Sequence, residues 1–139
     1  MMSDKGKLDK PGNPAENVTV QPAASGEYVV LSLKGKMVYE TADSFAKALE
    51  TIIRAKTCYV FEVDNLERLD STGFGVLITM AKKISSLEGQ VGFAVSNEFH
   101  RELFEIAKFD YVFPIAANPR EVWQMIQDGF QPRISLPQY

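Results

Sequence analysis

Short apolar runs that alternate with helical patterns are the feature that most constrains the fold of this chain. Three runs have the length and the β-branched and aromatic content of strands: Glu27 to Leu33, Thr57 to Val63 and Val91 to Val95. Each run is followed by apolar residues at helical spacing, namely Phe45, Leu49, Ile52 and Ile53, then Phe74, Leu77, Ile78, Ala81 and Ile84, then Phe99, Leu103 and Ala107. Because successive strands separated by helices need crossover connections, the pattern predicts an α/β fold with a largely parallel sheet.

Two further segments extend this sheet, and a last helix follows them. Val18 to Val20 can form an antiparallel hairpin with Tyr28 to Leu33 at one edge, and Val112 to Ile115 is composed like a short final strand. Asn118 followed by Pro119 is typical of a helix N-terminus, and we expect that helix to run through Asp128 and to end at Gly129. The sequence thus predicts a mixed, mostly parallel sheet of about five strands with about four helices.

The positions of proline delimit one folded domain. No proline occurs between Pro22 and Pro114, and the other five prolines lie outside that interval. A length of 139 residues suits one hydrophobic core, and 45% apolar with 24% charged residues is typical of a globular protein. We predict a polar, flexible N-terminal arm at residues 1–17, one domain at residues 18–128 and a C-terminal tail at residues 129–139.

Composition argues against several classes of partner. The 15 basic and 18 acidic residues give a net charge of −3, which does not supply the basic surface that nucleic acid requires. Cys58 is the only cysteine and His100 the only histidine, so we expect no intramolecular disulfide and no metal site. We expect His100, between Phe99 and Arg101, to lie at the surface. Neither a signal peptide nor an apolar stretch of 18 residues occurs, so we expect a cytoplasmic protein without membrane insertion.

The segment from Asp64 to Gly75 carries the candidate functional site. It is predicted to connect the strand ending at Val63 to a helix beginning near Thr72, with Ser71 as the N-cap. The helix dipole favours negative charge there, so a phosphate on Ser71 would be well placed. Gly73 and Gly75 remove side chains near Ser71, which would let another protein approach its hydroxyl closely. The alternative is a plain capped helix without a functional serine.

Other interpretations of the same residues are weaker or remain open. Val76 and Met80 lie off the main apolar face of their helix, so they either form a docking surface or pack beneath a neighbouring helix. A hydrolase would need Ser71 as nucleophile, His100 as base and Asp70 or Asp110 as orienting group, but the Gly-x-Ser-x-Gly context is missing. Phosphate-binding and dinucleotide-binding glycine motifs are also absent, so we expect no enzyme and no cofactor.

The residues from Phe61 to Gly75 resemble the signature of the sulfate-transporter and anti-sigma-factor-antagonist (STAS) domain family. That signature is an apolar strand with an acidic residue, an apolar pair and Asp-Ser-Ser/Thr-Gly-Leu-Gly. It is matched here by Glu62, Leu66, Leu69, Asp70, Ser71, Thr72, Gly73, Phe74 and Gly75. Leu33 to Met37 looks like the early strand and glycine turn of the family, and Glu98 to Pro114 like its third helix and last strand. The resemblance extends over Val18 to Gln127.

The resemblance implies a phosphorylation-controlled binding module. Stand-alone domains of this type are anti-sigma factor antagonists, which when unphosphorylated bind an anti-sigma factor with serine kinase activity and so release a sigma factor. Ser71 stands at the phosphoacceptor position of the family, and a serine phosphatase reverses the modification. The partner-binding residues expected from the match are Asp70, Ser71, Thr72, Gly73, Phe74, Gly75 and Val76.

Charge explains how such a switch would work. A phosphate would add about −1.5 to −2 charges beside Asp70, in a segment expected to hold Glu62, Asp64 and Glu67 against Arg68 alone. We expect it to penalise an interface that packs around a neutral hydroxyl, without unfolding the domain. Two alternatives stay open: a STAS scaffold or transporter-associated subunit in which Ser71 only caps a helix, and a nucleotide-sensing or small-ligand-sensing STAS domain.

Overall fold

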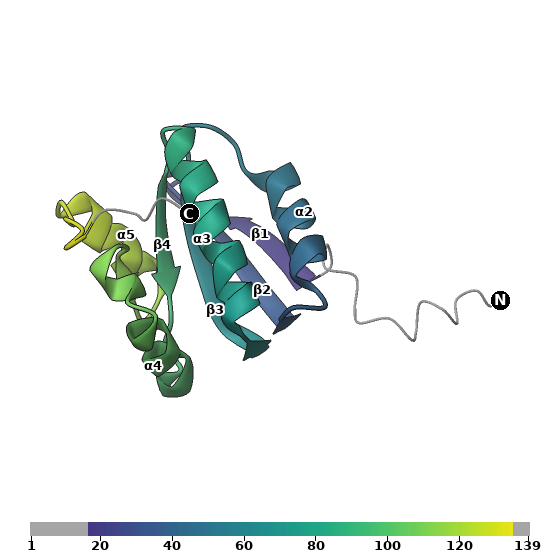
Figure 1. Cartoon of the computed structure of the whole chain (residues 1–139). Helices are drawn as coiled ribbons and strands as arrows, with labels where there is room; N and C mark the ends of the chain where they lie inside the picture. Colours follow the sequence, from purple (N-terminus) through teal and green to yellow (C-terminus); the bar gives the residue numbers. More distant parts are fainter. Residues whose placement is uncertain (1–16, 135–139) are drawn as a thin grey trace.

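A five-stranded sheet forms the centre of the molecule (Figure 1). The structure, a computed structural model, describes residues 17–134, so most of the predicted N-terminal arm and the end of the predicted tail lie outside the described residues. The strand order follows the sequence, and the strands are β1 (Val18–Pro22), β2 (Val29–Met37), β3 (Cys58–Leu69), β4 (Gln90–Ala94) and β5 (Ile115–Ala116). β1 pairs antiparallel with β2, whereas every later pair is parallel. The predicted α/β class and the N-terminal hairpin are therefore confirmed.

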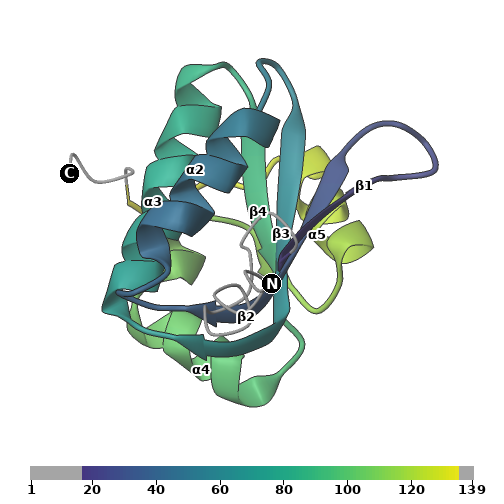
Figure 2. The same ribbon diagram turned by 90° about the vertical axis from the view of Figure 1, so that its right-hand side faces the viewer.

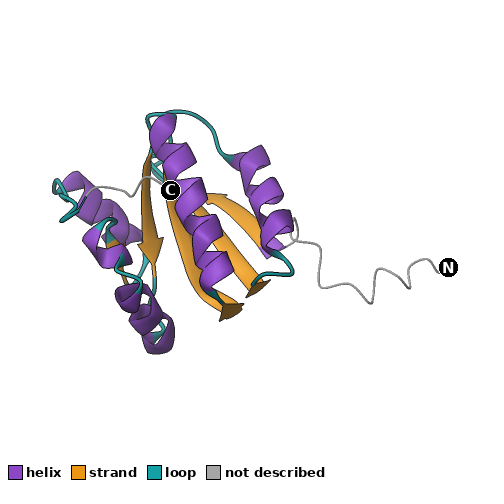
Figure 3. Cartoon of the chain, viewed as in Figure 1, coloured by secondary structure: helices purple, strands orange, loops and turns teal. Residues whose placement is uncertain are grey.

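Helices cover both faces of this sheet (Figures 2 and 3). Those on one face are α2 (Ala42–Ile52), α3 (Ser71–Ser86) and α4 (Glu98–Ile106), and α5 (Pro119–Gln127) lies on the other. Successive strand residues point to opposite faces, so Phe61 and Phe93 join the larger core while Val60 and Ala94 pack with Val122 of α5. Among residues 17–134, no helix is long and apolar enough to cross a membrane.

Strand β3 is longer than the sequence suggests. The predicted strand end at Val63 is wrong, because β3 continues to Leu69. Its added half pairs with the second half of β2, from Lys34 opposite Asn65 to Met37 opposite Leu69, and the register shifts before Lys34 and again between Gly35 and Lys36. Buried Leu66 holds this half against the core. The stretch predicted as a loop is thus mostly strand, and helix α3 follows after a single residue.

The third helical segment is rotated relative to the prediction. Phe99, Leu103 and Ala107 were expected to face the core, but Phe99 is 67% exposed and Ala107 is exposed. His100 and Phe104 are buried instead, which also corrects the surface position predicted for His100. Phe104 belongs to an aromatic cluster whose ring centroids lie 5.1–5.5 Å apart, formed with Phe74, Phe93 and Phe109. Packing against this cluster sets the rotation of α4.

The end of the domain follows the predicted order with a shorter strand. The segment Val112 to Ile115 is not a strand throughout, because a 3-10 turn η2 (Phe109–Tyr111) precedes it and β5 begins only at Ile115. The Asn118 side chain accepts a hydrogen bond from the backbone N–H of Glu121, which confirms the predicted cap of α5. Gly129 has φ +85°, the left-handed conformation that suits glycine after a helix end.

Candidate functional site

Asp70, and not Ser71, is the N-cap of α3. Its Oδ1 accepts a hydrogen bond from the backbone N–H of Gly73 at 2.9 Å, and its Oδ2 accepts one from the backbone N–H of Tyr39 at 3.1 Å. The prediction that Ser71 caps the helix is therefore wrong. A carboxylate has two acceptor oxygens, so Asp70 bonds to the first turn of the helix through one oxygen and to the turn after β2 through the other. We call this pair of hydrogen bonds the Asp70 clamp.

Ser71 is the first residue of α3 and is exposed. Because Asp70 provides the cap, the Ser71 hydroxyl is not the group that starts the helix. Thr72, the next residue, is half-buried. The predicted phosphoacceptor Ser71 thus lies on the surface at the first position of α3. It directly follows Asp70, whose side chain accepts hydrogen bonds from α3 and from the turn after β2.

The two glycines of the motif have different roles. A Cβ on Gly73 would overlap the carbonyl oxygen of Met37 and lie 2.7 Å from Cδ1 of Leu69, so this residue allows α3 to approach the ends of β2 and β3. A Cβ on Gly75 would meet no atom within 4 Å. The prediction that both glycines open the surface near Ser71 therefore fits Gly75 alone, since Gly73 is buried. Gly73 serves internal packing.

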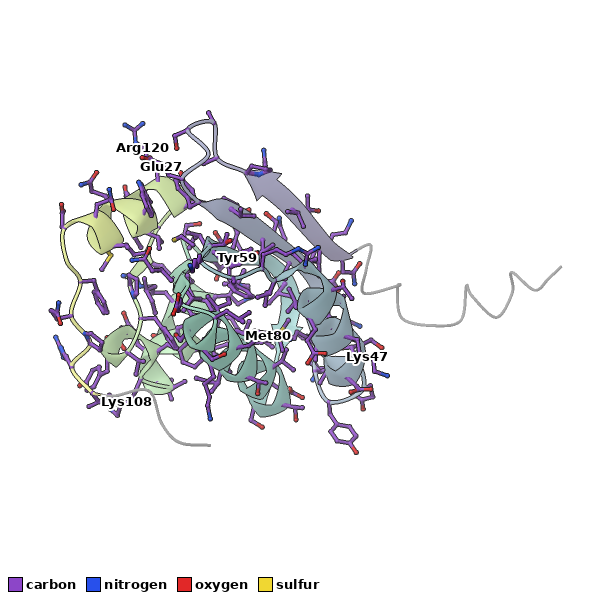
Figure 4. The ribbon with its side chains drawn as sticks, turned by 90° about the horizontal axis from the view of Figure 1, so that it is seen from above. Glu27, Lys47, Tyr59, Met80, Lys108 and Arg120 are labelled. Carbon is purple, nitrogen blue, oxygen red and sulfur yellow. The ribbon has the colours of Figure 1, made fainter. Side chains whose placement is uncertain are left out.

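The apolar members of the predicted partner-binding set belong mainly to the core. Phe74 is half-buried. Its ring packs edge-on against those of Phe104 and Phe109, with 5.1 Å between the ring centroids in each pair. Val76 is 8% exposed and Met80 is fully buried between α3 and the sheet (Figure 4). Of the two interpretations of Val76 and Met80, packing is therefore correct and a docking surface is wrong.

The acidic residues predicted around Ser71 do not all gather there. Glu62 accepts a hydrogen bond from the Ser32 hydroxyl at 2.6 Å, so it lies on the sheet beside β2. Asp64 accepts hydrogen bonds from the backbone N–H groups of Ser96 and Asn97, at the start of α4. Because β3 is extended, these carboxylates are held away from the start of α3.

Tyr39 is a site residue that the sequence analysis missed. Its backbone N–H donates to Asp70 and its side chain is 74% exposed. Tyr39 follows the carboxyl end of β2, and the helix start at Ser71 follows the carboxyl end of the neighbouring parallel strand β3. Carboxyl ends of parallel strands meet at one edge of the sheet, which is the signal that could have linked the two segments.

Two residues considered for reactive chemistry, His100 and Cys58, are both buried. His100, the base that a hydrolase would need, is 7% exposed. Burial raises the pKa of the Cys58 thiol to about 12, so this cysteine stays protonated and unreactive. Within the described range, no group of three His, Cys, Asp or Glu side chains is placed to hold a metal ion.

Comparison of the sequence with models of known protein families identifies the family of this chain. Residues 17–122 match the STAS domain. The chain belongs to the STAS family. The match takes in all five strands and the start of α5, so the helix start at Ser71 lies within the part of the chain that matches the STAS domain.

Individual proteins resemble this chain in sequence or in structure, all at low sequence identity. A STAS-domain containing protein of Pseudomonas aeruginosa (strain UCBPP-PA14) is 23% identical over 99 residues, which cover 71% of this chain and 98% of the relative. An anti-sigma factor antagonist from Mycobacterium paratuberculosis superposes with a TM-score of 0.68 at 19% identity, covering 80% of this chain and 93% of that one. The Bacillus cell fate determinant SpoIIAA in its phosphorylated form superposes with a TM-score of 0.56 at 18% identity, covering 78% and 98%.

The charge of Asp70 stabilises this STAS domain. The pKa of the Asp70 carboxyl lies below its ordinary value, mainly because the carboxylate accepts a hydrogen bond from the Gly73 N–H. Partial burial raises this pKa. The N–H groups of Tyr39 and Thr72 and the charge of Arg68 lower it further. An unfolded Asp titrates near pH ~3.9. Since the folded pKa is lower, ionised Asp70 stabilises the fold above that pH, and this contribution is lost as the pH falls through the lowered folded value.

We expect Asp70→Ala to reduce the free energy of unfolding at pH 7 by about 1–2 kcal/mol, because the cap of α3 and the bond to Tyr39 are both lost. Asp70→Asn keeps an acceptor for Gly73 without the charge, so its stability should lie between those of the wild type and Asp70→Ala. The advantage of the wild type over Asp70→Asn should shrink as the pH falls from about 7 to about 3. Urea unfolding followed by circular dichroism measures both effects, and wild-type stability in Asp70→Ala would disprove the clamp.

Proposed function

We propose that this STAS protein is an anti-sigma factor antagonist controlled by phosphorylation of Ser71. In its unphosphorylated form it binds an anti-sigma factor that has serine kinase activity, and so releases a sigma factor in the cytoplasm. Phosphorylation of Ser71 by that partner ends the interaction, and a serine phosphatase restores it. The chain acts in this scheme as a binding module and a kinase substrate, not as an enzyme.

The placement of Ser71 is the observation that carries this proposal. Its side chain is exposed at the first position of α3, where a kinase can reach a hydroxyl. Asp70, the residue before Ser71, bonds to Tyr39, and Gly73, two residues after Ser71, packs against Met37. A kinase or a partner therefore meets Ser71 on a rigid element with an open position, Gly75, one turn further along the helix.

A phosphate at this position would change binding more than folding. The helix N-terminus favours an anion, so the modified domain should stay folded. Asp70 is ionised beside it, Glu67 is exposed three residues before the helix cap, and Arg68 carries a positive charge nearby. A partner surface that packs on the neutral hydroxyl would have to desolvate about −1.5 to −2 added charges next to Asp70.

The relatives agree with this proposal. The mycobacterial protein of the same fold is an anti-sigma factor antagonist, and SpoIIAA of Bacillus exists in a phosphorylated form. Family membership makes the same type of regulation a reasonable expectation for this chain, and the exposed Ser71 supplies the acceptor that it requires.

Phosphate mapping tests the proposal directly. Intact-mass measurement and peptide mapping should find one phosphate on Ser71 after the full chain is incubated with ATP and an extract of its native cells. Ser71→Ala should abolish this modification, because it removes the hydroxyl that would carry the phosphate. Thr72→Ala is the matched control and should leave it unchanged, since Thr72 is the neighbouring hydroxyl and is half-buried. A phosphate that persists in Ser71→Ala, or none in the wild type, would refute the switch.

A further inference from the structure

A pocket lies at the opposite end of α3 from Ser71. It has a volume of about 260 Å³ and opens between the end of α3, the start of β4, the segment after η2, and α5 with the residues that follow it. Figure 1 shows these elements together where α3 ends and β4 begins, beside α5. Ser85, at the pocket, is 14 residues after Ser71, which places the two serines about 21 Å apart along the helix. The pocket is therefore separate from the candidate phosphorylation site.

The walls of this pocket are mainly apolar, and its polar side chains are uncharged. The apolar lining comes from several elements and includes Val91, Phe113, Pro114, Ile126, Phe130 and Pro132. Ser85 and Gln90 add a hydroxyl and an amide, and both residues are exposed, so these groups lie toward the opening. Among residues 17–134, no Asp, Glu, Lys or Arg lines the pocket. A charged ligand would lose its hydration there without gaining a counter-charge.

The segment after α5 is anchored where it forms one wall. The backbone N–H of Arg133 donates to the carbonyl oxygen of Tyr111 at 2.6 Å. The Arg133 guanidinium lies 4.8 Å from the centre of the Tyr111 ring, and Nζ of Lys108 lies 5.0 Å from the same centre. The two Arg133 contacts with Tyr111 hold the segment that contains Phe130 and Pro132 against the domain. Both residues, like Ile126, lie beyond residues 17–122, so this wall is outside the part that matches the STAS family.

We propose that this pocket binds a small, uncharged aromatic molecule of one or two rings. A cavity of about 150 Å³ accommodates benzene, and pockets for drug-sized ligands start at about 300 Å³, so 260 Å³ suits a ligand between these sizes. The half-buried Phe130 supplies a ring for aromatic contacts, whereas Phe113, which is 4% exposed, forms part of the apolar floor. One polar group on the ligand would reach Ser85 or Gln90. This activity goes beyond the proposed phosphorylation switch and does not depend on it.

Indole is a suitable probe because it is uncharged, has two fused rings and carries one N–H donor. Titration of indole into the full-length protein, followed by amide chemical shifts in NMR spectra, should give saturable shifts at Gln90, Val91 and Phe113. We expect a dissociation constant of about 0.1–1 mM, as for other ligands of about nine heavy atoms. Ser85→Phe should weaken binding at least about tenfold, because a phenyl group added at that position occupies the pocket.

Two further variants make this test decisive. Ser86→Phe introduces the same side chain at the next exposed serine, which does not line the pocket, and should bind indole within about twofold of the wild type. Phe130→Ala removes a wall and should also weaken binding about tenfold, so the test does not depend on one substitution. Absence of saturation at about 10 mM indole, shifts confined to other surfaces, or unchanged affinity in Ser85→Phe would overturn the proposal.

Discussion

Gly73→Ala is expected to reduce the free energy of unfolding by about 2–3 kcal/mol, a large fraction of the stability of a domain of this size. The added methyl group would overlap the backbone carbonyl of Met37 and contact Leu69 at 2.7 Å. A carbonyl in a strand cannot turn aside as a flexible side chain can, so α3 would have to move away from the ends of β2 and β3. The shift would also strain the Asp70 clamp. Chemical denaturation measures the loss as a lower midpoint with an unchanged slope.

Gly75→Ala provides the matched control for that experiment. Gly75 lies two residues further along the same helix, and an added Cβ there meets no atom within 4 Å. Alanine has the higher helix propensity, so this variant should be stabilised by about 0.5–1 kcal/mol. Gly73→Ala and Gly75→Ala are therefore expected to change the free energy of unfolding in opposite directions. Equal effects of the two substitutions would mean that Gly73 is not required for close packing.

Ser71→Glu should weaken binding to the anti-sigma factor at least about 100-fold, provided the proposed function is correct. The carboxylate adds a charge where the interface packs on a neutral hydroxyl, beside ionised Asp70. Ser71→Ala removes only the hydroxyl and should keep binding within about tenfold of the wild type. Isothermal titration calorimetry with the purified anti-sigma factor gives both affinities.

A second serine on the same helix controls for the added charge. Ser86 ends α3 and is exposed, so Ser86→Glu places the same charge at the far end of α3. Its affinity for the anti-sigma factor should stay within about twofold of the wild type, since exposed charges a Debye length or more apart are largely screened. Native circular dichroism of all three variants would exclude unfolding as the cause. Wild-type affinity in Ser71→Glu would rule out the electrostatic mechanism.

The order of strands and helices could be predicted because each element has a local signal. The runs from Thr57 and from Val91 are dense in β-branched and aromatic residues, and both became strands in the expected parallel sheet. Asn118 with Pro119 identified the last helix start for the same reason, since cap and proline act within one turn. These features depend on neighbouring residues in the sequence.

The errors concern contacts between segments that are distant in the sequence. The second half of β3 is a strand because β2 offers it a partner, and the sequence from Asp64 to Leu69 alone resembles a polar loop. The apolar spacing in α4 fits two faces, and only the aromatic cluster around Phe93 decides that Phe104 turns inward. Likewise, Asp70 replaces Ser71 as cap because it also bonds to Tyr39, 31 residues earlier. Register, rotation and shared hydrogen bonds require the tertiary structure.

The Asp70 clamp has a consequence for the kinetics of any complex formed at Ser71. Because the clamp ties the start of α3 to the turn after β2, the surface around Ser71 is already ordered before a partner arrives. Little conformational entropy then remains to be lost on association, and encounter needs orientation but no folding step. Changes at such a preformed surface alter mainly the lifetime of the complex and much less the rate at which it forms. A phosphate on Ser71 would accordingly act as a release signal, shortening the time for which a bound partner stays.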